Sequence, residues 1–353
     1  MKQNWCWLPF LFLAACGQDA PSDAENTNAS ATPPAEEQTA APANSAQLRA
    51  VSAEILLGQF ESDVTDLAAW EAQPFGFQSL VLAANGEAGI VSVRADGGNA
   101  QAIVTEPTTV RFAAAETPEG EGLLITLAAE GTIQARATDD LAAAPRDLLS
   151  LPSARDLCTD GSLVLAVGGM GGEVIMGQTD LPIASIPNGA LNCEVLGDDI
   201  YVQTAEGWDR LTSAGLEPTP LPRTASTLVR AGSQVFAMGP SGANGELSIN
   251  DQSIPLETNL GEPLRPLMVA AAYGNLGGVL RDGALIILDE QRNLYLVGWS
   301  GIANQLGLPG QLPSVRAPMG SAEVEFEGPN DEITLDAPEF EETPAPLPPG
   351  RDQ

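Results

Sequence analysis

The sequence contains no histidine, and its only lysine is Lys2. A catalytic triad or dyad that uses histidine as its base is therefore excluded, and so is a histidine-rich zinc site. A mature form without its N-terminus also lacks a lysine for nucleotide phosphates or for a Schiff base. Basic residues are scarce as a whole, with 15 Lys and Arg against 47 Asp and Glu in 353 residues.

This imbalance gives a formal net charge of -32. We expect no nucleic-acid partner, because contacts to phosphates need basic side chains and the field of the chain is negative. Calcium or another hard cation suits such a surface better. The alternative is that the charge only keeps an exported protein soluble.

The long apolar runs of a membrane span are missing, and residues 1–16 instead predict a lipoprotein signal peptide. Trp5 to Leu13 is an apolar core too short to span a bilayer. Leu13-Ala14-Ala15-Cys16 follows it and is similar to a bacterial lipobox, in which cleavage leaves a lipid on Cys16. The alternative is an ordinary secretory signal with a chance cysteine. Gly17, rather than Asp, favours outer-membrane sorting, with the protein facing the periplasm.

Two further segments lack apolar periodicity. Residues 17–48 consist mainly of Ala, Pro, Ser, Thr, Asn, Gln and acids, which predicts a disordered tether. Residues 318–353 hold ten acids and one Arg and end in a Pro-rich stretch. They predict a disordered acidic tail, with the gathering of cations as an alternative role.

Residues 49–317 remain as the folded domain, and their pattern predicts an all-β protein. Short runs rich in Val, Leu and Ile alternate with Gly, Asn and Asp clusters, as in strands and turns. The clearest runs are 79–83, 89–93, 123–127, 163–167, 200–203, 234–238 and 284–288. Equivalent runs recur about every 40 residues, which is typical of propeller blades. Six repeats fit the length and predict a six-bladed β-propeller, with a sandwich or irregular β domain as the alternative.

Several segments are also similar, in order and spacing, to those of one known family. They are Asp63–Trp70 (DVTDLAAW), Ser79–Gly97, Asp156–Cys158, Leu191–Trp208, Asp282–Asp289 and Asn293–Ala303. Together they resemble the β-propeller phytase (BPP domain) family. The tryptophans Trp70, Trp208 and Trp299 occupy the places of tryptophans in that family.

This resemblance implies a six-bladed propeller that uses several Ca²⁺ ions to release phosphate from phytate. Carboxylates at one end of the central channel would hold the metal, which activates the attacking water. The acids that match are Asp63, Asp66, Asp198, Asp199, Glu206, Asp282 and Asp289. The alternative for each is a turn residue that bonds its own backbone.

The sequence departs from the family at residues that carry the chemistry. Gly86 and Glu87 replace a pair of lysines, Leu191 replaces an acid, and Thr204 and Ala205 replace two acids. A charge-assisted hydrogen bond contributes about 1.5–3 kcal/mol, so these losses weaken phosphate binding strongly. We expect weak or no hydrolysis of phosphomonoesters.

Two cysteines remain once Cys6 has left with the signal segment and Cys16 has been acylated. Cys158 and Cys193 are 35 residues apart, about one repeat, so they occupy similar places in adjacent repeats. Outside the cytoplasm such a pair can be oxidised, which predicts a disulfide between neighbouring blades. The alternative is two buried thiols.

Three functions remain open at this point. The first is a degenerate, envelope-held relative of the phytases that binds cations, a phosphorylated small molecule or another envelope protein. The second is an active calcium-dependent 3-phytase in which Arg94, Arg111, Arg136 or Arg155 replaces the missing lysines. The third is an interaction propeller that serves as an assembly scaffold.

Overall fold

A computed structural model describes residues 48–72, 75–85, 89–98, 101–104, 109–241 and 245–314. The chain separates into Met1–Gln47 and Leu48–Gln353. The predicted signal segment with Cys16, residues 17–47 of the tether and the acidic tail lie outside the described residues. So do Gly86 and Glu87.

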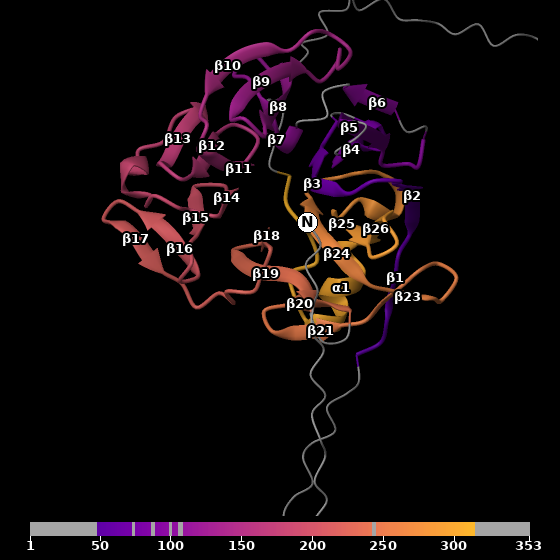
Figure 1. The fold of residues 1–353 in the computed structure, drawn as a ribbon. Helices are drawn as coiled ribbons and strands as arrows, with labels where there is room; N and C mark the ends of the chain where they lie inside the picture. The colour runs from indigo at the N-terminus through magenta and orange to yellow at the C-terminus, as the bar shows by residue number, and fades with distance from the viewer. Residues whose placement is uncertain are drawn as a thin grey trace, which may run out of the picture. The chain divides into compact units, whose positions relative to one another are not determined.

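The domain is built almost entirely from antiparallel sheets (Figure 1). Sheet 1 contains β3 (Val64–Trp70), β4 (Leu80–Asn85), β5 (Gly89–Arg94) and β6 (Gln101–Val104). Sheet 2 contains β7 (Thr109–Glu116), β8 (Gly122–Ala128), β9 (Thr132–Ala137) and β10 (Arg146–Ser150). Sheet 3 contains β11 (Ala154–Thr159), β12 (Val164–Gly168) and β13 (Gly171–Met176).

Sheets 4 and 5 follow in chain order, whereas sheets 6 and 7 each include a strand from the N-terminal end of the domain. Sheet 4 contains β14 (Asn192–Leu196), β15 (Asp199–Gln203), β16 (Trp208–Thr212) and β17 (Gly215–Pro218). Sheet 5 contains β18 (Thr227–Ala231), β19 (Gln234–Ser241), β20 (Glu246–Ile249) and β21 (Gln252–Ile254). Sheet 6 contains β24 (Pro266–Ala272), β25 (Ala284–Asp289), β26 (Asn293–Gly298) and β2 (Ile55–Gln59). Sheet 7 contains β1 (Val51–Ser52), β22 (Leu256–Glu257) and β23 (Pro263–Leu264).

The fold is an all-β propeller, but the prediction of six blades is wrong, because the described residues form seven sheets. Sheet 7 consists of three strands of two residues each, drawn from distant parts of the sequence. Runs this short show no alternation of apolar and polar residues. A count of apolar runs along the sequence therefore misses this sheet. Each of the seven apolar runs singled out above overlaps a strand of sheets 1 to 6.

Sheet 6 is completed by the N-terminal end of the domain. Strand β2 pairs antiparallel with β26, so that Ile55 lies opposite Leu296 and Gln59 opposite Asn293. Figure 1 shows this indigo strand beside the orange and yellow strands of the C-terminal region. The first and last parts of the described chain are thus joined in one sheet.

Apolar side chains from neighbouring sheets form the core. Strands β12 and β25 are buried along their whole length, because both faces of such a strand pack against another sheet. Sheets 2 and 3 share a cluster that includes Ile125, Leu127 and Val164. Sheet 7 packs its Val51, Leu256 and Leu264 into a cluster shared with sheets 5 and 6.

Helical structure is confined to short segments among the described residues. They are η1 (Gly76–Gln78), η2 (Ile183–Ser185), η3 (Gly278–Leu280) and α1 (Trp299–Leu306). Helix α1 begins with the fully buried Trp299, whose indole nitrogen donates to the carbonyl of Pro309 at 2.7 Å. In the part of the chain that the structure describes, no helix is long and apolar enough to cross a membrane.

Candidate functional site

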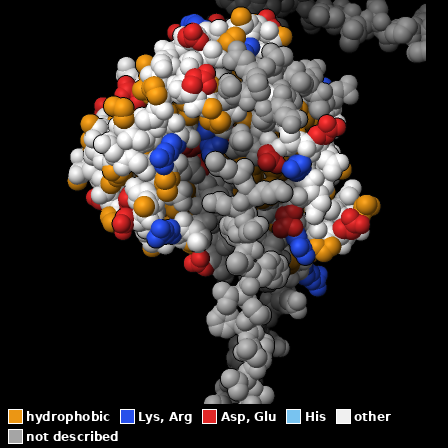
Figure 2. Space-filling model, viewed as in Figure 1, with side chains coloured by type: hydrophobic (Ala, Val, Ile, Leu, Met, Phe, Trp, Pro, Cys, Tyr) orange, Lys and Arg blue, Asp and Glu red, His pale blue; other side chains and the backbone are white. Residues whose placement is uncertain are grey.

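A cavity of about 470 Å³ lies at the centre of the propeller, where six of the seven sheets contribute wall residues. The inner strands that line it are β3, β7, β11, β14, β18 and β24. Leu191 and Leu267 belong to its wall and are 44% and 52% exposed. The cavity is therefore open to solvent. On the face that Figure 2 shows, acidic and basic side chains are scattered among apolar ones.

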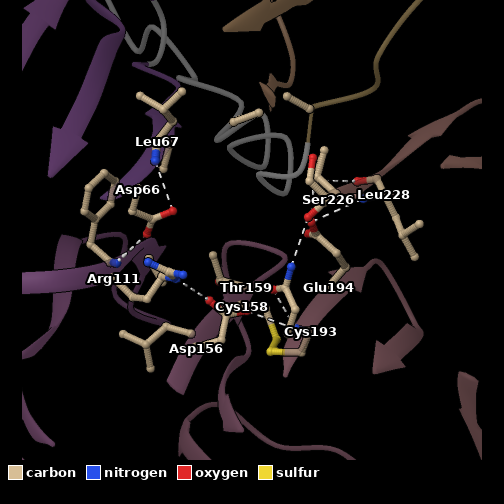
Figure 3. A pocket seen from close by; sticks show the side chains of 18 of the residues that line it. Asp66, Leu67, Arg111, Asp156, Cys158, Thr159, Cys193, Glu194, Ser226 and Leu228 are labelled. Carbon is tan, nitrogen blue, oxygen red and sulfur yellow. Dashed lines mark hydrogen bonds and ion pairs between the residues drawn. A yellow bond between two sulfur atoms is a disulfide. The ribbon is translucent and has the colours of Figure 1, made fainter. Parts of the chain in front are cut away.

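Charged side chains reach the cavity from equivalent places on three consecutive sheets. The pairing of β3, β7 and β11 with their neighbours shifts register just before Asp66, Arg111 and Asp156. Such a bulge re-aims the side chain that follows it. The three residues are each 45 positions apart in the sequence. Sheets 1 to 3 thus share the same register shift in their inner strands, and each places one charged side chain, Asp66, Arg111 or Asp156, at the cavity (Figure 3).

Asp66 links sheet 1 to sheet 2. Its Oδ2 accepts a hydrogen bond of 2.8 Å from the backbone N–H of Phe112 on β7. Its Oδ1 accepts one of 3.0 Å from the backbone N–H of Leu67. Both carboxylate oxygens are thereby engaged with backbone amides.

Asp156 links sheet 3 to both of its neighbours. Its Oδ2 accepts from the backbone N–H of Cys193 on β14 at 3.0 Å, and its Oδ1 lies 3.2 Å from Nε of Arg111 on β7. Arg111 also donates through Nη1 to the carbonyls of Thr65 and Val110, each at 2.7 Å. The guanidinium thus joins sheets 1, 2 and 3.

Glu194 continues the series from sheet 4 to sheet 5. Its Oε1 accepts from the hydroxyl of Thr227 at 2.5 Å and from the backbone N–H of Leu228 at 3.3 Å. On the other side of sheet 5, the hydroxyl of Tyr273 accepts from the backbone N–H of Arg230 at 3.1 Å. Sheet 5 is thus bonded from one side by Glu194 of sheet 4 and from the other by Tyr273, which directly follows β24 of sheet 6.

Burial dominates the ionisation of these groups. It raises the pKa of Glu194 to about 8, that of Asp66 to about 7 and that of Asp156 to about 6. Nearby Arg111 and backbone hydrogen bonds partly oppose this effect for Asp66 and Asp156. Burial also raises the pKa of Tyr273, and the adjacent Glu194 raises it further. The cavity therefore contains carboxyl groups that titrate near neutral pH.

The predicted disulfide is present in the cavity wall. Cys158 on β11 and Cys193 on β14 are joined, with an S–S distance of 2.03 Å and a Cα–Cα distance of 5.6 Å. The bond to Asp156 is made by the amide of the same Cys193. One covalent and one polar link therefore meet at the junction of sheets 3 and 4.

The structure spreads the seven acids predicted for calcium over the domain, and only Asp66 of them lines the central cavity. Asp63 pairs with Arg292 at 2.8 Å, and Asp199 pairs with Arg210. Asp282 accepts from the side chain of Gln311, and Asp289 from Asn293. Asp198 lies at the turn into β15, and Glu206 in the turn before β16.

The described residues contain no group of three or more Asp, Glu, Cys or His placed to hold a metal ion. Among the four predicted replacement arginines, Arg111 alone lines the cavity. Arg94 pairs with Asp96, and Arg136 donates to the carbonyl of Ala143 at 2.5 Å.

Sequence reasoning missed the roles of Asp156, Glu194 and Tyr273. Asp156 was noticed only as part of the segment Asp156–Cys158. A signal was available in the equal spacing of Asp66, Arg111 and Asp156. No comparable signal marks Glu194, whose strand pairs with β15 without a register shift.

Comparison with known proteins leaves the family open. No family model matches the chain, and no curated protein matches it. A solved structure of the WD40 β-propeller domain of Doa1 matches with 10% identity and a TM-score of 0.43, covering 71% of this chain and 96% of that one.

Two larger bacterial proteins also match. The extracellular domain of the putative hybrid two component system BT4673 from B. thetaiotaomicron matches with 14% identity and a TM-score of 0.37, covering 69% of this chain and 32% of that one. PorZ of Porphyromonas gingivalis, described as a surface component of the type-IX secretion system, matches with 14% identity and a TM-score of 0.33. That match covers 74% of this chain and 36% of PorZ. The chain thus spans about a third of the length of each. Likenesses this low carry no functional argument, and the sheets themselves identify the chain as a β-propeller.

Proposed function

We propose that this chain is a non-catalytic binding propeller, held at the bacterial cell envelope by a lipid on Cys16. In this proposal it is a degenerate relative of the β-propeller phytases. The central cavity is its binding site, and the acids that face the cavity hold the sheets together instead of holding metal.

One observation carries the proposal. The acids of the cavity wall bond the backbone of a neighbouring sheet, as Asp66, Asp156 and Glu194 do through Phe112, Cys193 and Leu228. A calcium site needs six to eight oxygen ligands, several of them carboxylate oxygens turned toward one point. Carboxylates already committed to separate amides on separate strands do not converge in this way. Polar side chains and a space suited to a small molecule remain.

Phosphate release from phytate tests the absence of catalysis. Full-length protein purified from membranes in detergent is assayed with and without millimolar calcium, from neutral to alkaline pH. Cooperative thermal unfolding of the same sample shows that it is folded. We expect no calcium-dependent release. Calcium-dependent release would overturn the proposal in favour of an active phytase, and its loss in Asp66→Asn would assign that activity to the central cavity.

Labelling of growing cells with radioactive palmitate tests the anchor. We expect the wild-type protein to be labelled and to sediment with membranes, whereas Cys16→Ser is neither labelled nor sedimented. Cys6→Ser is the matched control and should behave as wild type, because Cys6 leaves with the signal segment. An unlabelled wild-type protein would indicate an ordinary secretory signal.

A further inference from the structure

Arg111 and Glu194 in the cavity wall each have one polar side-chain atom that no described residue bonds. Arg111 uses Nη1 and Nε in its contacts, and no described residue bonds its Nη2. Glu194 uses Oε1, and no described residue bonds its Oε2. Neither free atom is among the buried polar atoms without a partner. The side chain of Arg111 is 35% exposed, and Glu194 is only partly buried.

The two free atoms lie in different parts of the cavity wall. Arg111 is on β7 and Glu194 is on β14, and β11 lies between these strands around the ring. Figure 3 shows the two side chains to either side of Asp156. Asp156 is already engaged by Arg111 and by the amide of Cys193. A ligand that meets both free atoms therefore needs a positive and a negative group that reach across the inner strand β11.

The rest of the cavity wall suits an extended ligand of small cross-section. Alanines are six of its lining residues, among them Ala68 on β3, Ala113 on β7 and Ala270 on β24. Polar side chains such as Thr159 on β11 and Asn192 on β14 line the part near Asp156 and Glu194. A molecule with a polar backbone and small side chains finds both kinds of surface in this cavity.

We propose that the cavity binds a short free peptide as a zwitterion, with its terminal ammonium at Glu194 Oε2 and its terminal carboxylate at Arg111 Nη2. The termini of a di- or tripeptide are several bonds apart, as the placement of the two side chains requires. An ammonium has three donors for the ionised carboxylate of Glu194, which releases its proton to solvent when the peptide binds, and Nη2 of Arg111 keeps its own N–H donors for the carboxylate of the peptide. This inference deepens the proposed binding function and rests on it.

Calorimetric titration with trialanine tests the inference directly, using the intact protein in detergent. We expect saturable binding of trialanine. We also expect binding of N-acetyl-trialanine and of trialanine amide to be weaker by about tenfold or more, since each has lost one charge-assisted contact. The amide peptide tests Arg111 without altering its ion pair with Asp156. Absence of trialanine binding, or equal binding of all three peptides, would overturn the inference.

The variant Glu194→Gln tests the other end of the site. It should weaken trialanine about tenfold or more and should leave the affinity for N-acetyl-trialanine nearly unchanged, which a general loss of structure would not do. Glu130→Gln is the matched control, because Glu130 is exposed and outside the cavity, and it should bind as wild type does. Equal weakening of both peptides by Glu194→Gln would count against the assigned contact.

The two proposals fail separately. Calcium-dependent phosphate release would end the non-catalytic function, whatever trialanine does. A folded protein that releases no phosphate and binds none of the three peptides would end the peptide assignment alone.

Discussion

The junction between sheets 3 and 4 and the junction between sheets 6 and 1 are held together in different ways. At the first, a disulfide joins Cys158 to Cys193, and Asp156 bonds the amide of Cys193. At the second, buried apolar side chains of both sheets share one cluster, with Leu67 and Ala83 from sheet 1 and Ile286 from sheet 6. The first junction thus adds a disulfide and a buried carboxylate to its apolar packing. The second relies on apolar packing, and its Asp63–Arg292 ion pair lies at the exposed surface.

This difference separates the conditions to which each junction responds. A disulfide depends on the redox state of the surroundings, and a buried carboxyl depends on pH. Apolar packing depends on the volume of the side chains and on neither of those conditions. Changes at the first junction should therefore be sensitive to reductant and to pH, whereas changes at the second should not.

Removal of the disulfide should have the largest effect. The variant with Cys158→Ala and Cys193→Ala frees a loop of about 35 residues, which on the chain-entropy model destabilises the fold by about 3–4 kcal/mol. Thermal unfolding with and without reductant measures this loss. Reductant should lower the midpoint of the wild type and leave the variant unchanged, and a wild type that ignores reductant would contradict the assignment.

Loss of one polar link between sheets should cost less. Asp66→Ala leaves the buried amide of Phe112 without its acceptor, and we expect a loss of about 1–3 kcal/mol. Urea unfolding of the variant provides the value. Asp66→Asn is the control, because its amide oxygen still accepts a hydrogen bond and should preserve most of the stability. Equal losses in both variants would mean that the hydrogen bond itself contributes little.

The pH dependence of stability should be smaller still, since these carboxyls are partly open to the cavity. Burial raises the pKa of Asp66 to about 7 and that of Glu194 to about 8, whereas unfolded carboxyls titrate near 4. At a pH between about 4 and these raised pKa values, Asp66 and Glu194 are protonated in the folded chain and ionised in the unfolded chain. The free energy of unfolding should therefore fall as the pH rises from about 4 to 8.

Urea midpoints at pH 5 and pH 8.5 measure this slope. Glu194→Gln, which cannot titrate, should show a flatter dependence than the wild type. A wild type that is more stable at pH 8.5 would show that its hydrogen bonds and Arg111 outweigh the burial of these groups.

A small change at the apolar junction completes the comparison. Ile286→Val removes one methylene from a fully buried position and should cost about 0.5–1.5 kcal/mol. Chemical unfolding at two pH values, with and without reductant, should give the same pH slope and the same response to reductant as the wild type. A change in either response would show that the two junctions are coupled.

The sequence predicted the class of fold because each of sheets 1 to 6 has at least one strong apolar run. Ala284–Asp289, for example, is buried throughout, and such a run is visible without a structure. The spacing of Cys158 and Cys193 likewise matched one repeat, and the two residues meet. The seventh sheet was not predictable, because Val51–Ser52 and its partners are too short to form a pattern.

The candidate site was predicted only in part. Asp66 was named, but as a calcium ligand, whereas its oxygens bond the amides of Leu67 and Phe112. Which way such a side chain turns depends on the register shift next to it, between Val64 and Asp66. Register shifts arise from the pairing of strands in three dimensions, and the order of apolar residues does not reveal them.

The closure of sheet 6 by β2 has a consequence for how the domain is made. The partner of Ile55–Gln59 is Asn293–Gly298. Strand β2 leaves the ribosome first, and it cannot pair with β26 until nearly the whole domain has been synthesised. If the chain is exported N-terminus first, the same delay applies to its passage through the membrane. Contacts so distant in sequence form late and slowly. A chain that stops before residue 293 leaves β2 with an unpaired edge, and such an edge is prone to aggregate.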